Sequence, residues 1–544
     1  MKLGIAIAEI FKREGIEILT GYPVNHLIEY AAMVDIRPVM VRQERVAIHM
    51  SDAISRLSSG RTIGAVCMQY GPGAENSMGG VAQCFGESVP VLVLPMGYAR
   101  RLAHIEPNFN ATVAMKAFSK STEAIFDAKE VPNIFRRAFT LLRNGRGGPV
   151  VVEIPLDMWD EEVPEPLDYT PVLRTRCGPD PAHVREAAEI LVNAKRPVIH
   201  AGQGVHYAMA WPQLRRLAER LAIPVMTTLD GKSAFPETHP LSLGAAGLAM
   251  ARTIPKFIGE ADVIFGIGCS FTDTDYGVAI PKGKTIIHAT LDPAHLNKDV
   301  TAKIGLLGDA ALVLDALLEE VQKRVPVNRD AGPVAARIAA AHAEWLAKWM
   351  PKLTCNDAPL NPYRVLWDLQ HTVDKANTII THDAGSPRDQ LTPFWKADVP
   401  LSYIGWGKTT QLGTGLGLAM GAKLAYPDKL CINVWGDAAI GFTGMDFETA
   451  VRERIPILSI LLNNFCMAIE LKPMPVSTEK YRSTDISGDY AAMARAFGAY
   501  GERITRPEDI IPAIQRGIAK TKEGVPALLE FITSKETETS RAGT

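Results

Sequence analysis

Residues 430–464 read LCINVWGDAAIGFTGMDFETAVRERIPILSILLNN, and this stretch decides the fold of the chain. The apolar run at 430–434 predicts a buried strand, the spacing at 444–454 predicts a helix, and the apolar run at 456–462 predicts a second strand. A strand, a helix and a strand in this length form a βαβ unit with parallel strands. The residues expected on one face of the helix are Met445, Phe447, Ala450 and Val451.

Each of these two strands is followed by a short polar dipeptide, Gly436-Asp437 after the first and Asn463-Asn464 after the second. Either dipeptide alone is an ordinary turn. A right-handed crossover brings the carboxyl ends of both strands to one sheet edge, where open α/β sheets bind ligands, so Asp437 and Asn464 are expected close together. A carboxylate and an amide oxygen are hard ligands that suit Mg²⁺ or Ca²⁺ better than zinc. The pair therefore indicates a metal bridge for a diphosphate.

This pattern resembles the thiamine diphosphate motif, in which Gly-Asp-Gly is followed after some two dozen residues by Asn-Asn. Residues 439–462 separate the two halves here, and Ala438 replaces the third glycine. An added methyl group at this position could crowd the diphosphate or demand a different backbone angle. The resemblance implies thiamine diphosphate and Mg²⁺ as cofactors. It also implies three metal ligands: the side chains of Asp437 and Asn464 and the backbone carbonyl of Cys466.

Composition is typical of a soluble globular protein, with 47% hydrophobic and 22% charged residues among 544. The net charge of −2 gives no indication of a nucleic acid or a membrane surface as partner. No apolar run is long enough to span a bilayer, and the amino-terminal residues read as an amphipathic helix. Seven scattered cysteines without a CxxC pair favour a reducing compartment, so we expect a cytoplasmic protein.

Alternating strand and helix signals divide the chain into three α/β units, each expected to be a doubly wound, mostly parallel sheet. The boundaries are 1–165, 182–325 and 360–533, with a polar tail or lid at 534–544. By resemblance these are the pyrimidine-binding, central and diphosphate-binding domains. In that family each cofactor lies between two chains, which implies a homodimer or a homotetramer.

Glu44 begins a helix in RQERVAIHMSDAISR, where an acidic residue usually serves the helix dipole. The stretch also resembles the thiamine-enzyme pattern in which a glutamate precedes a helix rich in small residues. That chemistry needs a carboxyl group in an apolar pocket, hydrogen-bonded to the aminopyrimidine, with its pKa raised by desolvation. The resemblance therefore assigns Glu44 both a catalytic and a cofactor-binding role.

Four further residues are catalytic candidates. Phe109 and Asn110 lie in a loop at 102–122 that resembles the substrate-facing loop of acetolactate-synthase-like enzymes, which have Phe-Gln there. Glu470 stands where pyruvate-decarboxylase-like enzymes place an acid or base, although a helical glutamate is more often exposed. Asn25, in the turn after the first strand, completes the set.

Other positions correspond to cofactor contacts in relatives. Leu412 falls where relatives place a large apolar residue beneath the cofactor, although such a residue is also ordinary core. The glycine-rich turn after it opens a helix whose amides can approach a phosphate. The expected cofactor-binding residues besides Glu44 are Gly71, Asn76, Gly385, Ser386, Gln411, Leu412, Gly436, Asp437, Ala438, Ala439, Asn464, Cys466 and Met467.

The central unit carries a weak signal. Residues 198–204 form a strand that ends in a glycine turn, but the turn is not a full GxGxxG and the helix after it is weak. In relatives this domain binds FAD, binds the ADP part of coenzyme A, or binds nothing.

Three functions remain open on the sequence. The preferred interpretation is a 2-hydroxyacyl-CoA lyase that releases formyl-CoA and a carbonyl compound, because Glu470, the Phe109-Asn110 loop and the tail favour it. The first alternative is an acetolactate synthase-like carboligase or decarboxylase of 2-oxo acids. The second is a non-catalytic relative, which should have lost Glu44, Asp437 and Asn464. The expected partner is accordingly a small molecule, either an acyl-CoA or a 2-oxo acid.

Overall fold

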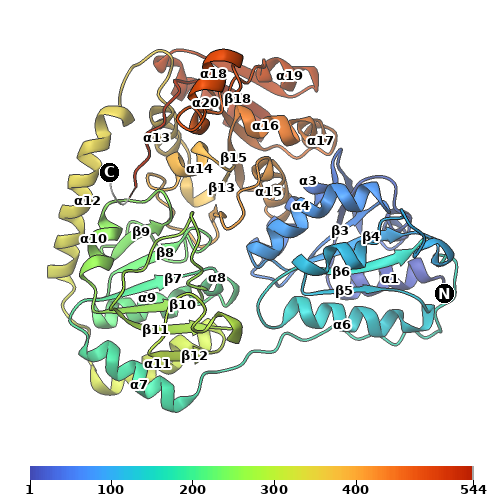
Figure 1. Ribbon diagram of the computed structural model, residues 1–544, viewed down its shortest axis with the longest axis horizontal. Helices are drawn as coiled ribbons and strands as arrows, with labels where there is room; N and C mark the ends of the chain where they lie inside the picture. The colour runs from blue at the N-terminus through green and yellow to red at the C-terminus, as the bar shows by residue number, and fades with distance from the viewer. Residues whose placement is uncertain (542–544) are drawn as a thin grey trace.

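The computed structural model describes residues 1–541 and contains three domains, each built on a parallel six-stranded sheet with helices on its faces (Figure 1). The expected fold class of three doubly wound parallel-sheet domains is confirmed. A linker between the first and the central domain runs from residue 156 to residue 180 without a helix or a strand. None of the described helices is long and apolar enough to cross a membrane.

The first domain has the strand order β2-β1-β3-β4-β6-β5. Its strands are β1 (Ile18–Gly21), β2 (Arg37–Met40), β3 (Gly64–Met68), β4 (Val91–Gly97), β5 (Ser121–Ala124) and β6 (Val150–Pro155). Its helices are α1 (Leu3–Arg13), α2 (Leu27–Met33), α3 (Glu44–Leu57), α4 (Pro72–Gly86), α5 (Ala111–Ala114) and α6 (Val131–Arg143). Every residue of α3 is buried, so this helix lies inside the protein on all its faces.

The central domain has the strand order β12-β11-β10-β7-β8-β9. Its strands are β7 (Pro197–Ala201), β8 (Val225–Thr228), β9 (Ser242–Ala246), β10 (Val263–Ile267), β11 (Thr285–Thr290) and β12 (Ile304–Leu307). Its helices are α7 (Pro181–Asn193), α8 (Gly204–Tyr207), α9 (Trp211–Leu221), α10 (Thr253–Glu260) and α11 (Ala310–Arg324). The long helix α12 (Gly332–Leu353) follows and leads to the third domain along one side of the molecule (Figure 1).

The third domain has the strand order β14-β13-β15-β16-β18-β17. Its strands are β13 (Thr378–His382), β14 (Tyr403–Ile404), β15 (Leu430–Gly436), β16 (Leu458–Asn463), β17 (Tyr500–Ile504) and β18 (Ala527–Ile532). Its helices are α13 (Pro362–Thr372), α14 (Ser386–Leu391), α15 (Thr414–Ala425), α16 (Asp437–Thr443), α17 (Phe447–Arg452), α18 (Pro475–Tyr481), α19 (Tyr490–Ala496) and α20 (Ile510–Lys522).

The first and third domains share one hydrophobic core, in which α3 packs on α15. Two glycines of α15 allow this close approach. A Cβ on Gly417 would lie 2.6 Å from the Cβ of His49, and one on Gly421 would lie 2.2 Å from the carbonyl oxygen of Met50. The amino terminus of α3, which carries Glu44, is thereby held against the third domain.

The helix expected at 444–454 is wrong in its bounds. The chain enters α16 directly at Asp437, passes through a 3₁₀ turn at Gly444–Asp446, and continues as α17. The tighter 3₁₀ winding breaks the 3.6-residue period, so the predicted apolar face does not form as a unit. Phe447 and Ala450 are buried, whereas Met445 is 53% exposed.

Residues 534–541 pack against the body of the protein. Ser540 is buried, and its hydroxyl donates to the backbone carbonyl of Met250 at 2.7 Å. In return, the backbone N–H of Met250 donates to the backbone carbonyl of Ser540 at 2.8 Å. The indole N–H of Trp345 on α12 donates to the same hydroxyl at 2.8 Å. The tail therefore ties α12 to the central domain.

Candidate active site

The βαβ unit brings Asp437 and Asn464 together at the carboxyl edge of the third sheet. In the register of β15 and β16, Gly436 pairs with Leu462, so both strands end at the same level. The backbone N–H of Cys466 donates to Asp437 Oδ2 at 3.1 Å and to Asn464 Oδ1 at 2.9 Å. Two side-chain oxygens from the two ends of the motif thus converge on one N–H.

The donor set at this edge fits a hard divalent cation. Asp437 is 4% exposed, and burial raises the pKa of its carboxyl group, against the effect of hydrogen bonds from Cys466 and its neighbours. The carbonyl of Cys466 lies in the same turn, where it accepts the N–H of Ala468 at 2.9 Å. A carboxylate, an amide oxygen and a backbone carbonyl are ligands that Mg²⁺ accepts, with phosphate oxygens and water completing its octahedron.

A small pocket of about 40 Å³ opens beside these groups. Gly385, with φ of +79°, has no atom within 4 Å of the position that a Cβ would take, so its backbone borders free space. Ala438 is the second residue of α16 and has helical backbone geometry, so its methyl group needs no unusual angle. The lining residues that the sequence predicted are Gly385, Ser386, Leu412, Gly436, Asp437, Ala438, Ala439, Asn464, Cys466 and Met467.

The sequence did not single out several other lining residues. Pro362 and Thr533 reach the pocket from α13 and from the end of β18, and Pro387 and Gln390 belong to α14. These positions carry no motif of their own. Gln390 stands four residues after Ser386, so a helical interpretation of the residues after Gly385 could have placed it on the same face.

Glu44 lies in the first domain, at the start of α3, with a side chain that is 5% exposed. Burial raises the pKa of its carboxyl group, and a hydrogen bond from the side-chain amide of Asn76 (3.4 Å) partly opposes this shift. The other carboxyl oxygen lies beside Gly73, where a Cβ would come within 3.1 Å of it. Gly71, with φ of +55°, directly precedes α4, the helix that contains Gly73.

The Glu44 carboxyl group does not line the pocket beside Asp437. All described residues that line the pocket belong to the third domain, and neither Glu44, Gly71 nor Asn76 is among them. Gln411 also lies outside the lining, with its amide against Gly79 of α4. The described lining of this pocket therefore contains no residue of the first domain.

The remaining catalytic candidates take different positions. Glu470 ends a 3₁₀ turn at Ala468–Glu470, next to the pocket residue Ile469, and is half-buried. Asn110 caps α5 by accepting the N–H of Val113 at 3.0 Å, and Phe109 beside it packs on the shared core. The side-chain amide of Asn25 donates to the backbone carbonyls of Met68 on β3 (2.9 Å) and Leu94 on β4 (3.3 Å), so it links these two neighbouring strands.

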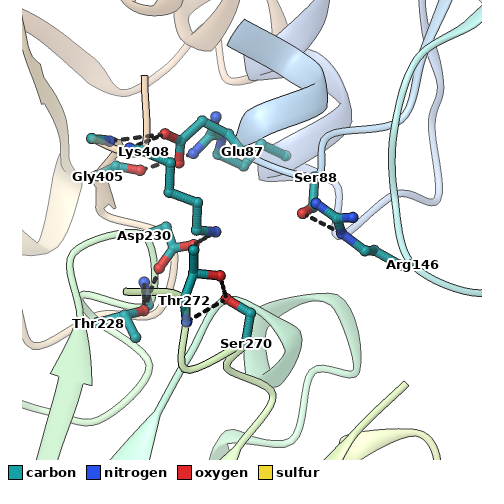
Figure 2. Close-up of polar contacts among 12 residues, drawn as sticks. Glu87, Ser88, Arg146, Thr228, Asp230, Ser270, Thr272, Gly405 and Lys408 are labelled. Carbon is teal, nitrogen blue, oxygen red and sulfur yellow. Dashed lines mark hydrogen bonds and ion pairs between the residues drawn. The ribbon is translucent and has the colours of Figure 1, made fainter. Parts of the chain in front are cut away.

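A second and larger cavity, of about 290 Å³, lies where the three domains meet. Lys408 of the third domain reaches into it and pairs with Asp230 of the central domain at 2.8 Å, while Glu87 of the first domain accepts the backbone N–H of Lys408 at 2.6 Å (Figure 2). On the far wall, Arg146 donates to Ser88 at 2.8 Å.

The walls of this cavity carry buried polar atoms that have no partner among residues 1–541. They are Ser59 Oγ, Glu87 Oε2, His200 Nδ1, Gln203 Nε2 and Tyr207 OH. Buried polar groups are normally satisfied, so these atoms indicate a polar occupant. The sequence signalled only the glycine turn at 202–204, because the other walls come from residues far apart in the chain.

Comparison with known proteins agrees with this architecture. Sequence models of the thiamine pyrophosphate enzyme family match in three places: the N-terminal TPP binding domain at residues 1–125, the central domain at 184–317, and the C-terminal TPP binding domain at 383–531. The three matches follow the three sheets in order.

Curated relatives match nearly the whole chain. A probable acetolactate synthase large subunit of Methanocaldococcus jannaschii is 30% identical over 98% of this chain and 92% of its own length. The acetolactate synthase isozyme 3 large subunit of Escherichia coli is 28% identical over 94% of this chain and 91% of its own. An acetolactate synthase of Mycobacterium bovis is 26% identical over 98% and 88%. The chain therefore belongs to the family of thiamine diphosphate-dependent enzymes, as an acetolactate synthase-like carbon–carbon lyase or carboligase.

Proposed function

We propose that this protein is a thiamine diphosphate- and Mg²⁺-dependent carboligase or decarboxylase of 2-oxo acids, similar in reaction to acetolactate synthase. The observation that carries the proposal is the pairing of Asp437 and Asn464 on one N–H, together with a buried Glu44. Full-length similarity to acetolactate synthase large subunits supports the 2-oxo acid reaction over the 2-hydroxyacyl-CoA lyase that the sequence alone favoured.

In this proposal, residues of the third domain bind the cofactor, and Glu44 of the first domain transfers a proton. When bound, thiamine diphosphate supplies an acidic carbon and an electron sink for the charge left on a cleaved carbonyl compound. Asp437, Asn464 and the Cys466 carbonyl would hold Mg²⁺ against the diphosphate. Leu412 would support the rings from below. Glu44 keeps a proton on its carboxyl group at a pH where an exposed glutamate has lost it, which suits proton exchange with a ring nitrogen.

A homodimer, or a tetramer of two such dimers, completes the site. The third domain of one chain offers the diphosphate pocket without an acid for the pyrimidine ring, and the first domain offers Glu44 without a metal site. Placing these two halves against each other across a two-fold axis gives two equal sites. The loop with Phe109 and Asn110 and the carboxyl group of Glu470 would then face the substrate.

The 2-hydroxyacyl-CoA lyase remains a second candidate because of the cavity between the three domains. Its volume of about 290 Å³, its unpartnered polar atoms and the cations Lys408 and Arg146 would accept an adenine nucleotide (Figure 2). Such a nucleotide is either FAD or the ADP part of coenzyme A. Bound coenzyme A would favour the lyase, whereas a bound flavin would favour the acetolactate synthase-like reaction.

Product analysis separates these functions. The protein with thiamine diphosphate and Mg²⁺ is incubated with pyruvate in one series and with a 2-hydroxyacyl-CoA in another, and products are identified by mass spectrometry. Acetolactate and carbon dioxide from pyruvate would support the proposal. Formyl-CoA with an aldehyde or ketone would replace it by the lyase. Cofactor binding without turnover of either compound would point to a non-catalytic relative.

A further inference from the structure

Asp383 lies at the end of β13, and none of its surface is exposed. Its carboxylate binds three backbone N–H groups. Oδ1 accepts from Ala384 at 2.8 Å and from Gly413 at 2.9 Å, and Oδ2 accepts from Gly415 at 2.9 Å. The backbone N–H of Asp383 donates to the carbonyl of Val434 on β15 at 2.7 Å, so the residue is fixed to the central strands of the sheet.

The two glycines bound by Asp383 form the turn that directly follows Leu412. Gly413 has φ of +86°, in the left-handed region, and its carbonyl accepts the hydroxyl of Thr443 at 3.0 Å. A Cβ on Gly415 would lie 2.3 Å from Asn433 Oδ1, so the backbone lies tightly on the sheet there. The position of the Leu412 side chain in the pocket depends on this turn.

Asp383 is a costly residue to bury. Burial raises the pKa of its carboxyl group to about 6, although the three N–H groups and the charge of Arg45 act to lower it. A neutral side chain of similar shape would avoid this desolvation cost. Its two oxygens, however, accept from both sides of the turn, and an asparagine would present an N–H group to one of the three donors.

Arg45 places a positive charge of the first domain near this carboxylate. Arg45 follows Glu44 in sequence and is 8% exposed. Its guanidinium lies over the ring of Phe442 on α16. It also approaches the turn, since a Cβ on Gly413 would lie 3.0 Å from Arg45 Nη2. The helix that carries Glu44 thus brings the Arg45 guanidinium close to the turn that follows Leu412.

We propose that Asp383 is a positioning residue. By holding the N–H groups of Gly413 and Gly415, it fixes the position of the Leu412 side chain relative to the bound cofactor. The inference rests on the proposed thiamine diphosphate chemistry. It predicts that loss of the carboxylate loosens the turn without unfolding the domain, and that cofactor binding and proton loss from the cofactor's reactive carbon both suffer.

The test compares Asp383→Asn with a matched variant, Asp446→Asn. Asp446 is 1% exposed, has a pKa raised by burial to about 6, and accepts the N–H of Arg42 at 2.7 Å, but it does not line the pocket. Amide hydrogen exchange of residues 411–418 is measured in the cofactor-free proteins. The dissociation constant of thiamine diphosphate with Mg²⁺ and the exchange rate of its C2 proton are measured in the loaded ones.

In Asp383→Asn we expect amide exchange at the turn to rise, and cofactor affinity and C2 exchange to fall, each by about 10- to 100-fold, because a hydrogen bond to a charged group is lost. Asp446→Asn should change none of the three. Equal values for Asp383→Asn and the wild type would overturn the inference. A wild type that binds no thiamine diphosphate would instead contradict the proposed function, whatever the variant does.

Gly413→Ala keeps the test decisive if Asp383→Asn does not fold. A Cβ at this position would lie 2.8 Å from the Cβ of Phe442, so the turn must shift while the Asp383 carboxylate stays. We expect the same loss of cofactor affinity. Unchanged affinity in Gly413→Ala would show that the position of the turn does not matter, and the inference would fall.

Discussion

At the scale of single residues, Glu44 combines a buried carboxyl group with a position at the start of a fully buried helix. We expect Glu44→Gln to lower the rate of C2 proton exchange and of product formation by about 10²- to 10⁴-fold, the usual contribution of a general acid or base. Cofactor affinity should change much less, because Glu44 does not line the pocket beside Asp437 that is proposed to bind the diphosphate. Exchange of the C2 proton followed by magnetic resonance measures the effect, with the exposed Glu186→Gln as control. Wild-type exchange in Glu44→Gln would remove Glu44 from the mechanism.

The same residue predicts a dependence of stability on pH. Burial raises the pKa of Glu44 in the folded protein above its unfolded value, so the folded state holds this proton more tightly. The carboxyl group costs no stability below its unfolded pKa and costs stability as the pH rises through its folded pKa. We therefore expect Glu44→Gln to raise the thermal midpoint of the cofactor-free protein at neutral pH, with a gain that disappears in acid. Scans across pH check this, and a gain that grows as the pH falls would contradict it.

At the scale of elements, the sequence predicted strands best where an apolar run is closed by turns. The apolar run at 456–462 was expected as a strand, and it forms β16 (Leu458–Asn463), all of whose residues are buried. No strand was predicted at β5 (Ser121–Ala124), because an edge strand that is only partly buried has no apolar run. The helix after Asp437 was misplaced, since a 3₁₀ turn interrupts its period.

The candidate site was also predictable only where its residues belong to one local sequence pattern. The proximity of Asp437 and Asn464 could be predicted, because both belong to one βαβ unit whose handedness is fixed by chain chirality. Pro362 and Thr533 could not, since they arrive from distant segments through tertiary packing. The junction of Glu87, Asp230 and Lys408 likewise joins residues of three domains that no local pattern connects.

The tail at 534–541 gives a prediction for one such distant contact. Ser540→Ala would leave the indole N–H of Trp345 without its acceptor inside the protein, at a cost of about 1–3 kcal/mol. We expect a lower thermal midpoint and faster proteolysis of the tail, with unchanged turnover per folded molecule. The exposed Thr537→Ala is the matched control. A loss of turnover without loss of stability would instead make the tail a lid over the substrate.

At the scale of the whole molecule, the proposal that each site lies between two chains makes a prediction about hybrid dimers. Glu44→Gln and Asp437→Asn chains should each be inactive as homodimers. If Glu44 of one chain serves Asp437 of the other, a dimer of the two different variants contains one intact site and one site that carries both substitutions. We expect such hybrids, isolated through two different affinity tags, to show about half of the wild-type rate.

A reciprocal hybrid makes this experiment decisive. A chain that carries both Glu44→Gln and Asp437→Asn is paired with a wild-type chain. Sites shared between chains then each receive one substitution, so the dimer should be inactive, whereas sites contained within single chains would leave it about half active. Sites shared between chains therefore predict an active first hybrid and an inactive second one, and sites within single chains predict the reverse. An inactive first hybrid with an active second one would place Glu44 and Asp437 in one chain's site and would refute the shared arrangement.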